Sequence, residues 1–351
     1  MKDVKFIDLF AGIGGIRIAF ENVGARCVFS SEFEPNCKST YYENFGEEPA
    51  GDITQIKPSS IPDHDILCAG FPCQPFSISG KQKGFADTRG TLFFNIMEII
   101  NKKKPSTVFL ENVKNLSKHD KGNTLKVIVK SLENAGYLVE VKVLNAKDYG
   151  VAQNRERTII VGSRNTRFDF SKVEKSPVKY VIKDILSQNE DFEYLKPEEY
   201  TIIDKKYWKV QRSGLIFCGY RNKKIRKKGV RPNTEHLSRV HKQPNRIYHV
   251  DGTHPTIPSQ EVSGRFWIYD GQKVRKLTIN ECFRLMGFPE EYKKVSSKPQ
   301  LYKQIGNSVP IPMIQAVAKE VMIQYYPDYF TEENTNIFKT PQLCMMNIAE
   351  N

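Results

Sequence analysis

Along its first 165 residues, the chain alternates short, strongly hydrophobic runs with stretches whose apolar residues recur at helical spacing. Six runs rich in β-branched and aromatic residues are predicted strands: 4–10, 26–32, 65–70, 106–112, 137–144 and 157–163. Helical patterns lie between them at 15–24, 91–104 and 122–136. This alternation predicts an α/β fold with a mostly parallel sheet covered on both faces.

The pattern changes after about residue 166. From there to about 275 the helical periodicity fades, and Lys, Arg, Pro, Tyr and Asn crowd together with interleaved Ile and Trp. A solvated linker would explain the charge, but the large apolar residues favour a small, ordered, basic domain. A helical pattern returns at 276–292, and residues 302–326 predict a tight turn followed by a long helix.

The formal net charge of this 351-residue chain is +13, which limits the classes of partner that it is expected to bind. Such a balance favours a polyanion, nucleic acid ahead of a membrane surface. No run of 18 uncharged apolar residues occurs, so no transmembrane helix is expected. Asp8 interrupts the apolar core that a signal peptide would need. We therefore expect a cytoplasmic protein.

The chain has seven cysteines, at positions 27, 37, 68, 73, 218, 282 and 344. Their number is odd, and no two of them form a CxxC pair. A disulfide framework or a zinc site is therefore not expected, and we predict reduced thiols and no metal. Cys27, Cys68 and Cys282 lie in apolar runs and are expected to be small core residues.

A glycine-rich turn follows the first predicted strand, in "FIDLFAGIGGIRIAF". Gly12, Gly14 and Gly15 would let the backbone approach a ligand at a helix N-terminus. Glu32 ends the second strand, where an acid can bind ribose hydroxyls, and Asp52 could accept from an adenine amino group. The GxGxxG spacing of dinucleotide sites is absent, so S-adenosylmethionine is favoured over NAD or FAD. Two aromatic residues could sandwich the adenine or simply pack in the core: Phe10 and Phe33.

Cys73 follows a predicted strand at the carboxyl edge, where open α/β sheets bind ligands. A thiolate is a strong nucleophile, and Pro72 and Pro75 restrict the backbone on either side of it. Glu111 ends the next strand. Two guanidiniums that could neutralise this acid or a phosphate enter a further strand: Arg155 and Arg157. Ordinary ion pairs would explain each residue alone, but their convergence on one sheet favours catalysis.

Six motifs occur in the order seen in bacterial DNA (cytosine-5) methyltransferases, and the chain resembles that family over residues 6–320. They are "DLFAGIGG", "GFPCQPFS", "ENV", "QNRER", "KLTINECFRLMGFP" and "GNSVP". The resemblance implies a Rossmann-like S-adenosylmethionine-dependent methyltransferase sheet with a small, mostly β or irregular target recognition domain. It implies four regions: a catalytic and cofactor domain at 1–185, target recognition at 186–275, a hinge segment at 276–303, and a C-terminal segment at 304–351 that returns to the catalytic domain.

The resemblance implies that Cys73 attacks cytosine C6 while Glu111, Arg155 and Arg157 assist, and C5 then takes the methyl group. A cofactor shell follows by matching motifs: Phe10, Gly12, Ile13, Gly15, Glu32, Phe33, Asp52, Ile53, Pro72, Leu92, Asn307 and Ser308. Phe33 departs from the family, which tends to carry Trp there, so the adenine stack would be smaller.

The family's substrate is double-stranded DNA whose target base is flipped out of the stack. Loop 77–92 would close on the DNA through Ser79, Lys81, Lys83 and Arg89. In the recognition region, Gln243 would fill the hole left by the cytosine, and Arg246 would bind guanine or only phosphate. Thr256 belongs to a second recognition loop. A short GC-containing palindrome, a cognate restriction endonuclease in the same bacterium and a monomeric enzyme are expected.

Three alternatives remain open on the sequence. An RNA (tRNA) cytosine-5 methyltransferase would share the fold, but the basic insertion of about 110 residues favours duplex DNA. A non-catalytic DNA-binding relative is disfavoured by the intact thiol, acid and guanidiniums. A flavin or nicotinamide oxidoreductase is disfavoured by the glycine spacing.

Overall fold

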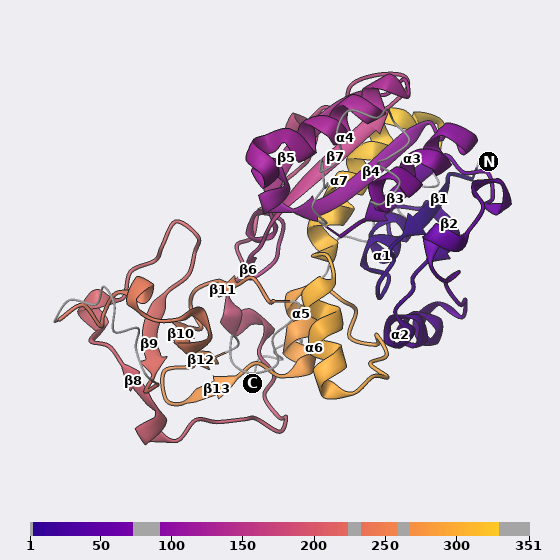
Figure 1. The fold of residues 1–351 in the computed structure, drawn as a ribbon. Coiled ribbons are helices and arrows are strands. Elements are labelled where there is room, and N and C mark those ends of the chain that lie inside the picture. The colour runs from indigo at the N-terminus through magenta and orange to yellow at the C-terminus, as the bar shows by residue number, and fades with distance from the viewer. Residues whose placement is uncertain (1–2, 73–91, 224–232, 259–266, 330–351) are drawn as a thin grey trace, which may run out of the picture. The chain divides into compact units, whose positions relative to one another are not determined.

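The structure, a computed structural model, describes residues 3–72, 92–223, 233–258 and 267–329 (Figure 1). Two compact units divide the chain. The first holds 1–145, 156–175 and 313–340, and the second holds 146–155, 176–312 and 341–351. These units are defined by contacts alone, so the four functional regions expected from the resemblance stay a prediction.

A six-stranded sheet forms the centre of the first unit. Its strands lie in the order β2 (Arg26–Ser31), β1 (Lys5–Leu9), β3 (Ile66–Gly70), β4 (Thr107–Val113), β7 (Glu156–Ser163), β5 (Leu138–Asn145). β7 runs antiparallel to both of its neighbours, while the β2, β1, β3 and β4 pairs are parallel. All six predicted strands are present, and the sheet is mostly parallel as predicted.

Helices cover both faces of this sheet. α3 (Leu92–Lys103) and α4 (Asn123–Asn134) share one hydrophobic core with alternate residues of β1, β3 and β4. On the other face, Phe20 of α1 (Gly15–Glu21) packs between Phe6 and Phe109. α2 (Pro35–Phe45) follows β2, and its residues Thr40 and Tyr41 are buried. None of the described helices is long and apolar enough to cross a membrane.

The C-terminal helix α7 (Ile311–Tyr325) brings the end of the described chain back to the first unit. Just beyond it, the Tyr326 hydroxyl donates to Thr107 Oγ1 at 2.9 Å. The Tyr329 hydroxyl donates to the Gly24 carbonyl at 2.7 Å, beyond the end of α1. These contacts join residues more than 200 positions apart.

The second unit carries a small β-sheet in the order β13 (Val274–Lys276), β12 (Trp267–Tyr269), β10 (Arg246–His249), β9 (Phe217–Arg221), β8 (Tyr200–Ile202). Its core contains Leu195, Cys218, Ile247, Trp267 and Val274. A two-stranded pair, β6 (Gln153–Asn154) with β11 (His254–Pro255), lies in the same unit. The described residues of the 166–275 region therefore include a small β-sheet with its own core, whereas residues 224–232 and 259–266 lie outside the described chain.

Two helices complete the second unit: α5 (Ile279–Leu285) and α6 (Lys298–Asn307). Residues 302–326 were expected to form a tight turn followed by a long helix. The long helix is present as α7, and the chain breaks between α6 and α7, at residues 308–310. Residues 302–307 before this break belong to α6, which the sequence pattern did not indicate.

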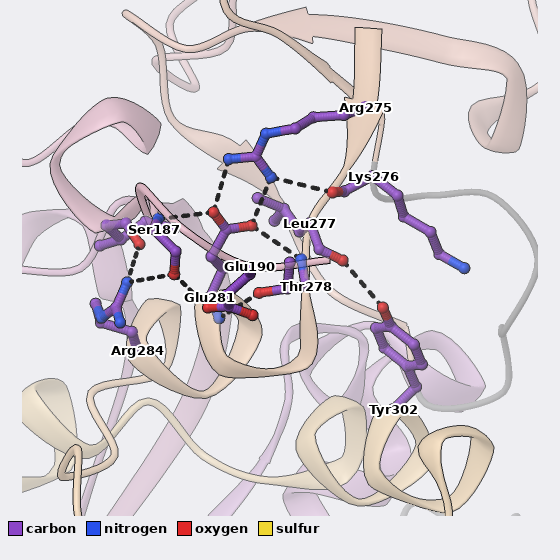
Figure 2. A network of polar contacts seen from close by, with 10 residues as sticks. Ser187, Glu190, Arg275, Lys276, Leu277, Thr278, Glu281, Arg284 and Tyr302 are labelled. Atoms are coloured by element: carbon purple, nitrogen blue, oxygen red, sulfur yellow. Dashed lines mark hydrogen bonds and ion pairs between the residues drawn. The ribbon is translucent and has the colours of Figure 1, made fainter. Parts of the chain in front are cut away.

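Figure 2 shows a polar network centred on Glu281, which is 0 % exposed. Its carboxylate accepts from both terminal nitrogens of Arg275, at 2.8 and 2.7 Å, and from the backbone N–H groups of Ser187 and Thr278, each at 2.9 Å. The Tyr302 hydroxyl donates to the Leu277 carbonyl at 2.9 Å. The network therefore joins β13, α5, α6 and the segment around residue 187.

Candidate active site

The glycine turn and the end of β2 are tied together by Glu32. One of its carboxylate oxygens accepts from the Gly12 N–H at 2.8 Å, and the other accepts from the Glu34 N–H at 2.8 Å. A carboxylate has about four acceptor positions, so each oxygen retains capacity for a ligand hydroxyl. Gly12 has φ 56°, and a Cβ there would meet nothing within 4 Å. The turn is thus open on its outer side, next to a fixed acid.

The two candidate aromatic residues differ. Phe33 is 69 % exposed, so it is not a core residue and its ring is available for stacking. Phe10 has a positive φ of 57° and is partly buried against the sheet core. Ile13 and Ile53 are buried, while the exposed Asp52 accepts from the Thr54 N–H at 2.9 Å.

Glu111 lies at the carboxyl end of β4, opposite Gly70 of β3. Arg157 Nε and a Glu111 carboxylate oxygen are 2.9 Å apart, and the two side chains are 11 % and 9 % exposed. Burial lowers the pKa of Arg157, and the Glu111 charge opposes that shift. Because an arginine stays protonated in proteins, the pair is a carboxyl group held by a charged guanidinium at a sheet edge.

Arg155 has different partners from Arg157. It is fully buried, and it donates to three backbone carbonyls of the second unit: Ile257 at 3.0 Å, Gly306 at 2.8 Å and Ser308 at 2.6 Å. From the sequence, both arginines were candidates to neutralise the catalytic acid or a phosphate. Arg157 forms an ion pair with Glu111.

Asn112 is a residue that the sequence prediction missed. It is 2 % exposed; its Nδ2 donates to the Phe71 carbonyl at 2.8 Å, and its Oδ1 accepts from the Val113 N–H at 2.8 Å. The amide therefore extends the pairing of β3 and β4 by one step beyond Gly70. Phe71 is two residues before Cys73. The sequence feature that could have indicated this role is the position of Asn112 directly after Glu111 at the end of a predicted strand.

Several predicted residues lie outside the described part of the chain: Cys73, Ser79, Lys81, Lys83 and Arg89. Pro72 is exposed just before that gap, and Leu92 begins α3 just after it. Asn307 is exposed at the end of α6, and Ser308 follows it. Gly15 is the first residue of α1 and is buried.

The recognition candidates lie on the second unit. Gln243 is exposed in a short 3-10 turn that leads into β10. Arg246 begins β10, and its Nε donates to the His241 carbonyl at 3.1 Å. The His241 ring stacks on Tyr220 with centroids 4.0 Å apart, and Tyr220 is the strand partner of Arg246. Thr256 is exposed, and its hydroxyl donates to the Asn154 carbonyl at 2.7 Å.

The chain is similar to known methyltransferases in sequence and in fold. The type II methyltransferase M.HhaI of Haemophilus parahaemolyticus is 45 % identical over 92 % of this chain and 95 % of its own length. M.NlaX of Neisseria lactamica, also a type II methyltransferase, is 43 % identical over 90 % of this chain and 96 % of its own. The crystal structure of S. pombe Dnmt2 methyltransferase shares the fold, with a TM-score of 0.67 and 17 % identity over 93 % of this chain and 100 % of that one.

The family model described as C-5 cytosine-specific DNA methylase matches residues 4–322. The match confirms the α/β methyltransferase fold and the resemblance predicted from six motifs, and it favours DNA over the RNA alternative. The chain therefore belongs to the C-5 cytosine-specific DNA methylases and is a DNA cytosine-5 methyltransferase.

Proposed function

We propose that this enzyme methylates a cytosine that is flipped out of duplex DNA, with Cys73 as the nucleophile and Glu111 and Arg157 as the groups that hold the base. The observation that carries the proposal is the buried Glu111–Arg157 pair at the carboxyl end of β4. Glu111 pairs with Gly70 of β3, and Gly70 is three residues before Cys73 in the sequence. Polar groups in this position can bind a base edge out of water.

The chemistry follows from the poor nucleophilicity of cytosine C5. Addition of the Cys73 thiolate to C6 breaks the C5–C6 double bond and makes C5 electron-rich. Glu111 accepts a hydrogen bond from the N4 amino group and passes its carboxyl proton to N3 as negative charge builds on the ring, and Arg157 holds the Glu111 side chain in position. After C5 has gained the methyl group, loss of the C5 proton expels the thiolate and restores the double bond. The base that removes this proton is unassigned.

S-Adenosylmethionine, the cofactor that we propose, supplies an electrophilic methyl group when bound. The residues of the first unit fit its adenosine part. Glu32 has acceptor capacity for ribose hydroxyls, Gly12 leaves open space, and the exposed Phe33 offers an aromatic face. We assign Phe10, Ile13, Gly15, Asp52, Ile53, Pro72, Leu92, Asn307 and Ser308 to the same shell on the motif match.

Duplex DNA is the proposed partner in solution, in accord with the net charge of +13. Arg246 is proposed to bind guanine, and Gln243 and Thr256 are proposed to act beside the flipped base. Because M.HhaI and M.NlaX are named type II methyltransferases, we propose that the methylation protects DNA of a bacterial cytoplasm from a cognate endonuclease.

Cys73→Ser tests the mechanism. A hydroxyl is not ionised near neutral pH, so methyl transfer should be abolished while DNA binding persists. The wild-type enzyme should form a covalent adduct with DNA carrying 5-fluorocytosine, because the fluorine cannot leave as the C5 proton does. An enzyme that methylates DNA but forms no such adduct would contradict the role of Cys73.

A further inference from the structure

Arg155 is unusual because a large charged side chain is fully enclosed. It is 0 % exposed, and it is among the largest side chains buried to that degree. Enclosing a guanidinium costs free energy, which hydrogen bonds to its donors offset. Here Nη1 donates to the Ile257 carbonyl, and Nη2 donates to the carbonyls of Gly306 and Ser308, at 2.6–3.0 Å. All three of these bonds are to backbone carbonyls.

The three carbonyls come from two segments that lie about 50 residues apart in the sequence. Gly306 and Ser308 flank Asn307 at the end of α6, where helical carbonyls lack partners within the helix. A cation is also favourable beside the negative end of a helix. Ile257 directly follows Thr256. One side chain therefore pins the backbone around Asn307 and next to Thr256.

The backbone that carries Arg155 is itself held along the recognition segment. β6 pairs with β11, and the His254 N–H donates to the Ala152 carbonyl at 2.7 Å. The Thr256 hydroxyl donates to the Asn154 carbonyl at the same distance. Residues 152–155 thus move with 254–257, and the reach of Arg155 to α6 joins both to the Asn307 segment (Figure 1 shows β6 and β11).

We propose that Arg155 is a positioning residue that couples cofactor binding to DNA recognition. This inference rests on the proposed function, which assigns Asn307 and Ser308 to the cofactor and Thr256 to the DNA. Loosening Arg155 should weaken cofactor affinity and sequence discrimination together. A catalytic Arg155 would behave differently, since its loss would slow the reaction of bound substrates and leave both binding properties unchanged.

The test compares Arg155→Lys with Arg157→Lys. Lysine keeps the charge but lacks the planar fork that reaches several acceptors at once. S-Adenosylhomocysteine affinity is measured by calorimetry, and discrimination is the ratio of Kd values for DNA with and without the methylated site, mapped first by sequencing. Thermal melting checks the fold. For Arg155→Lys we expect the affinity and the ratio each to fall by about tenfold, the effect of one lost charged hydrogen bond.

Arg157→Lys should instead lower kcat and leave S-adenosylhomocysteine affinity unchanged. The coupling is overturned if Arg155→Lys lowers the melting temperature alone, or lowers kcat alone. It is also overturned if only one of the two binding properties changes.

If Arg155→Lys does not fold, hydrogen exchange of the wild-type enzyme replaces it. S-Adenosylhomocysteine should then slow exchange at the Thr256 and Ile257 amides as well as at Asn307 and Ser308. Protection confined to the end of α6 would overturn the coupling. A wild-type enzyme that does not bind S-adenosylhomocysteine at all would reject the proposed function itself, and the coupling with it.

Discussion

Each unit of the molecule buries a glutamate against an arginine, but the surroundings of the two pairs differ. In the second unit, Glu281 is 0 % exposed, is bonded in bidentate fashion by Arg275, and caps α5 together with Thr278. In the first unit, Glu111 and Arg157 lie at a strand end and keep 9 % and 11 % of their side-chain surface. The same type of ion pair thus stabilises the fold in the second unit, whereas in the first unit it is proposed to contact the cytosine.

Glu111→Gln should give the largest effect on the reaction. The amide keeps the shape but cannot pass a proton to N3 of the cytosine as the thiol adds. We expect kcat to fall by about 10²–10⁴-fold, the usual contribution of a group that moves or holds a proton. Single-turnover methylation of DNA measures it. An unchanged rate would remove Glu111 from the mechanism.

Glu281→Gln should chiefly affect stability. Breaking one partner of a buried ion pair costs about 3–5 kcal/mol, because Arg275 would be left enclosed without its counter-charge. Urea unfolding followed by circular dichroism gives the free energy. At a temperature where the variant is folded, its specific activity should stay close to that of the wild type, in contrast to Glu111→Gln. A stable but inactive variant would reverse the comparison.

Arg246→Ala should have a smaller and selective effect on binding. A bidentate contact with guanine contributes about 1–3 kcal/mol of discrimination, so cognate binding should weaken by about tenfold or more, with little change on random DNA. Competition binding with both DNAs measures it. Equal losses would assign Arg246 to a phosphate contact. Lys242→Ala, which removes a nearby exposed charge, is the matched control.

Asp8 in β1 provides the mildest test, which concerns pH. Burial raises the pKa of this carboxyl to about 8, although the Arg17 charge opposes the shift. The folded state therefore binds a proton more tightly than the unfolded state, and stability should decrease as pH rises from about 4 to about 8. Asp8→Asn should remove this part of the dependence. The difference between the melting temperatures of Asp8→Asn and the wild type should shift in favour of the variant from pH 5 to pH 8. A difference that stays constant over this range would contradict the prediction.

Features that depend on local sequence pattern could be predicted, whereas those that depend on tertiary contacts could not. The strands of the large sheet are short segments rich in β-branched and aromatic residues, and β5 alternates apolar with polar residues, so their positions follow from the pattern. α2 left no such signal, because only Thr40 and Tyr41 of its residues are buried. Arg155 and Arg157 look equivalent in "QNRER", and only tertiary contacts separate them. Asn112 was missed because its partner, the Phe71 carbonyl, is a backbone atom 41 positions away.

Residues 146–155 belong to the second unit, although the residues on either side of them belong to the first, and this has an evolutionary consequence. On the proposed function, the recognition residues lie within 176–312, so exchange of that gene segment in one recombination event would transfer DNA specificity to a relative. The incoming segment would still have to pair its β11 with a resident β6, and offer carbonyls to a resident Arg155. Successful exchanges should therefore be limited to donors whose 254–257 and 306–308 segments can form these contacts with residues 146–155 of the host.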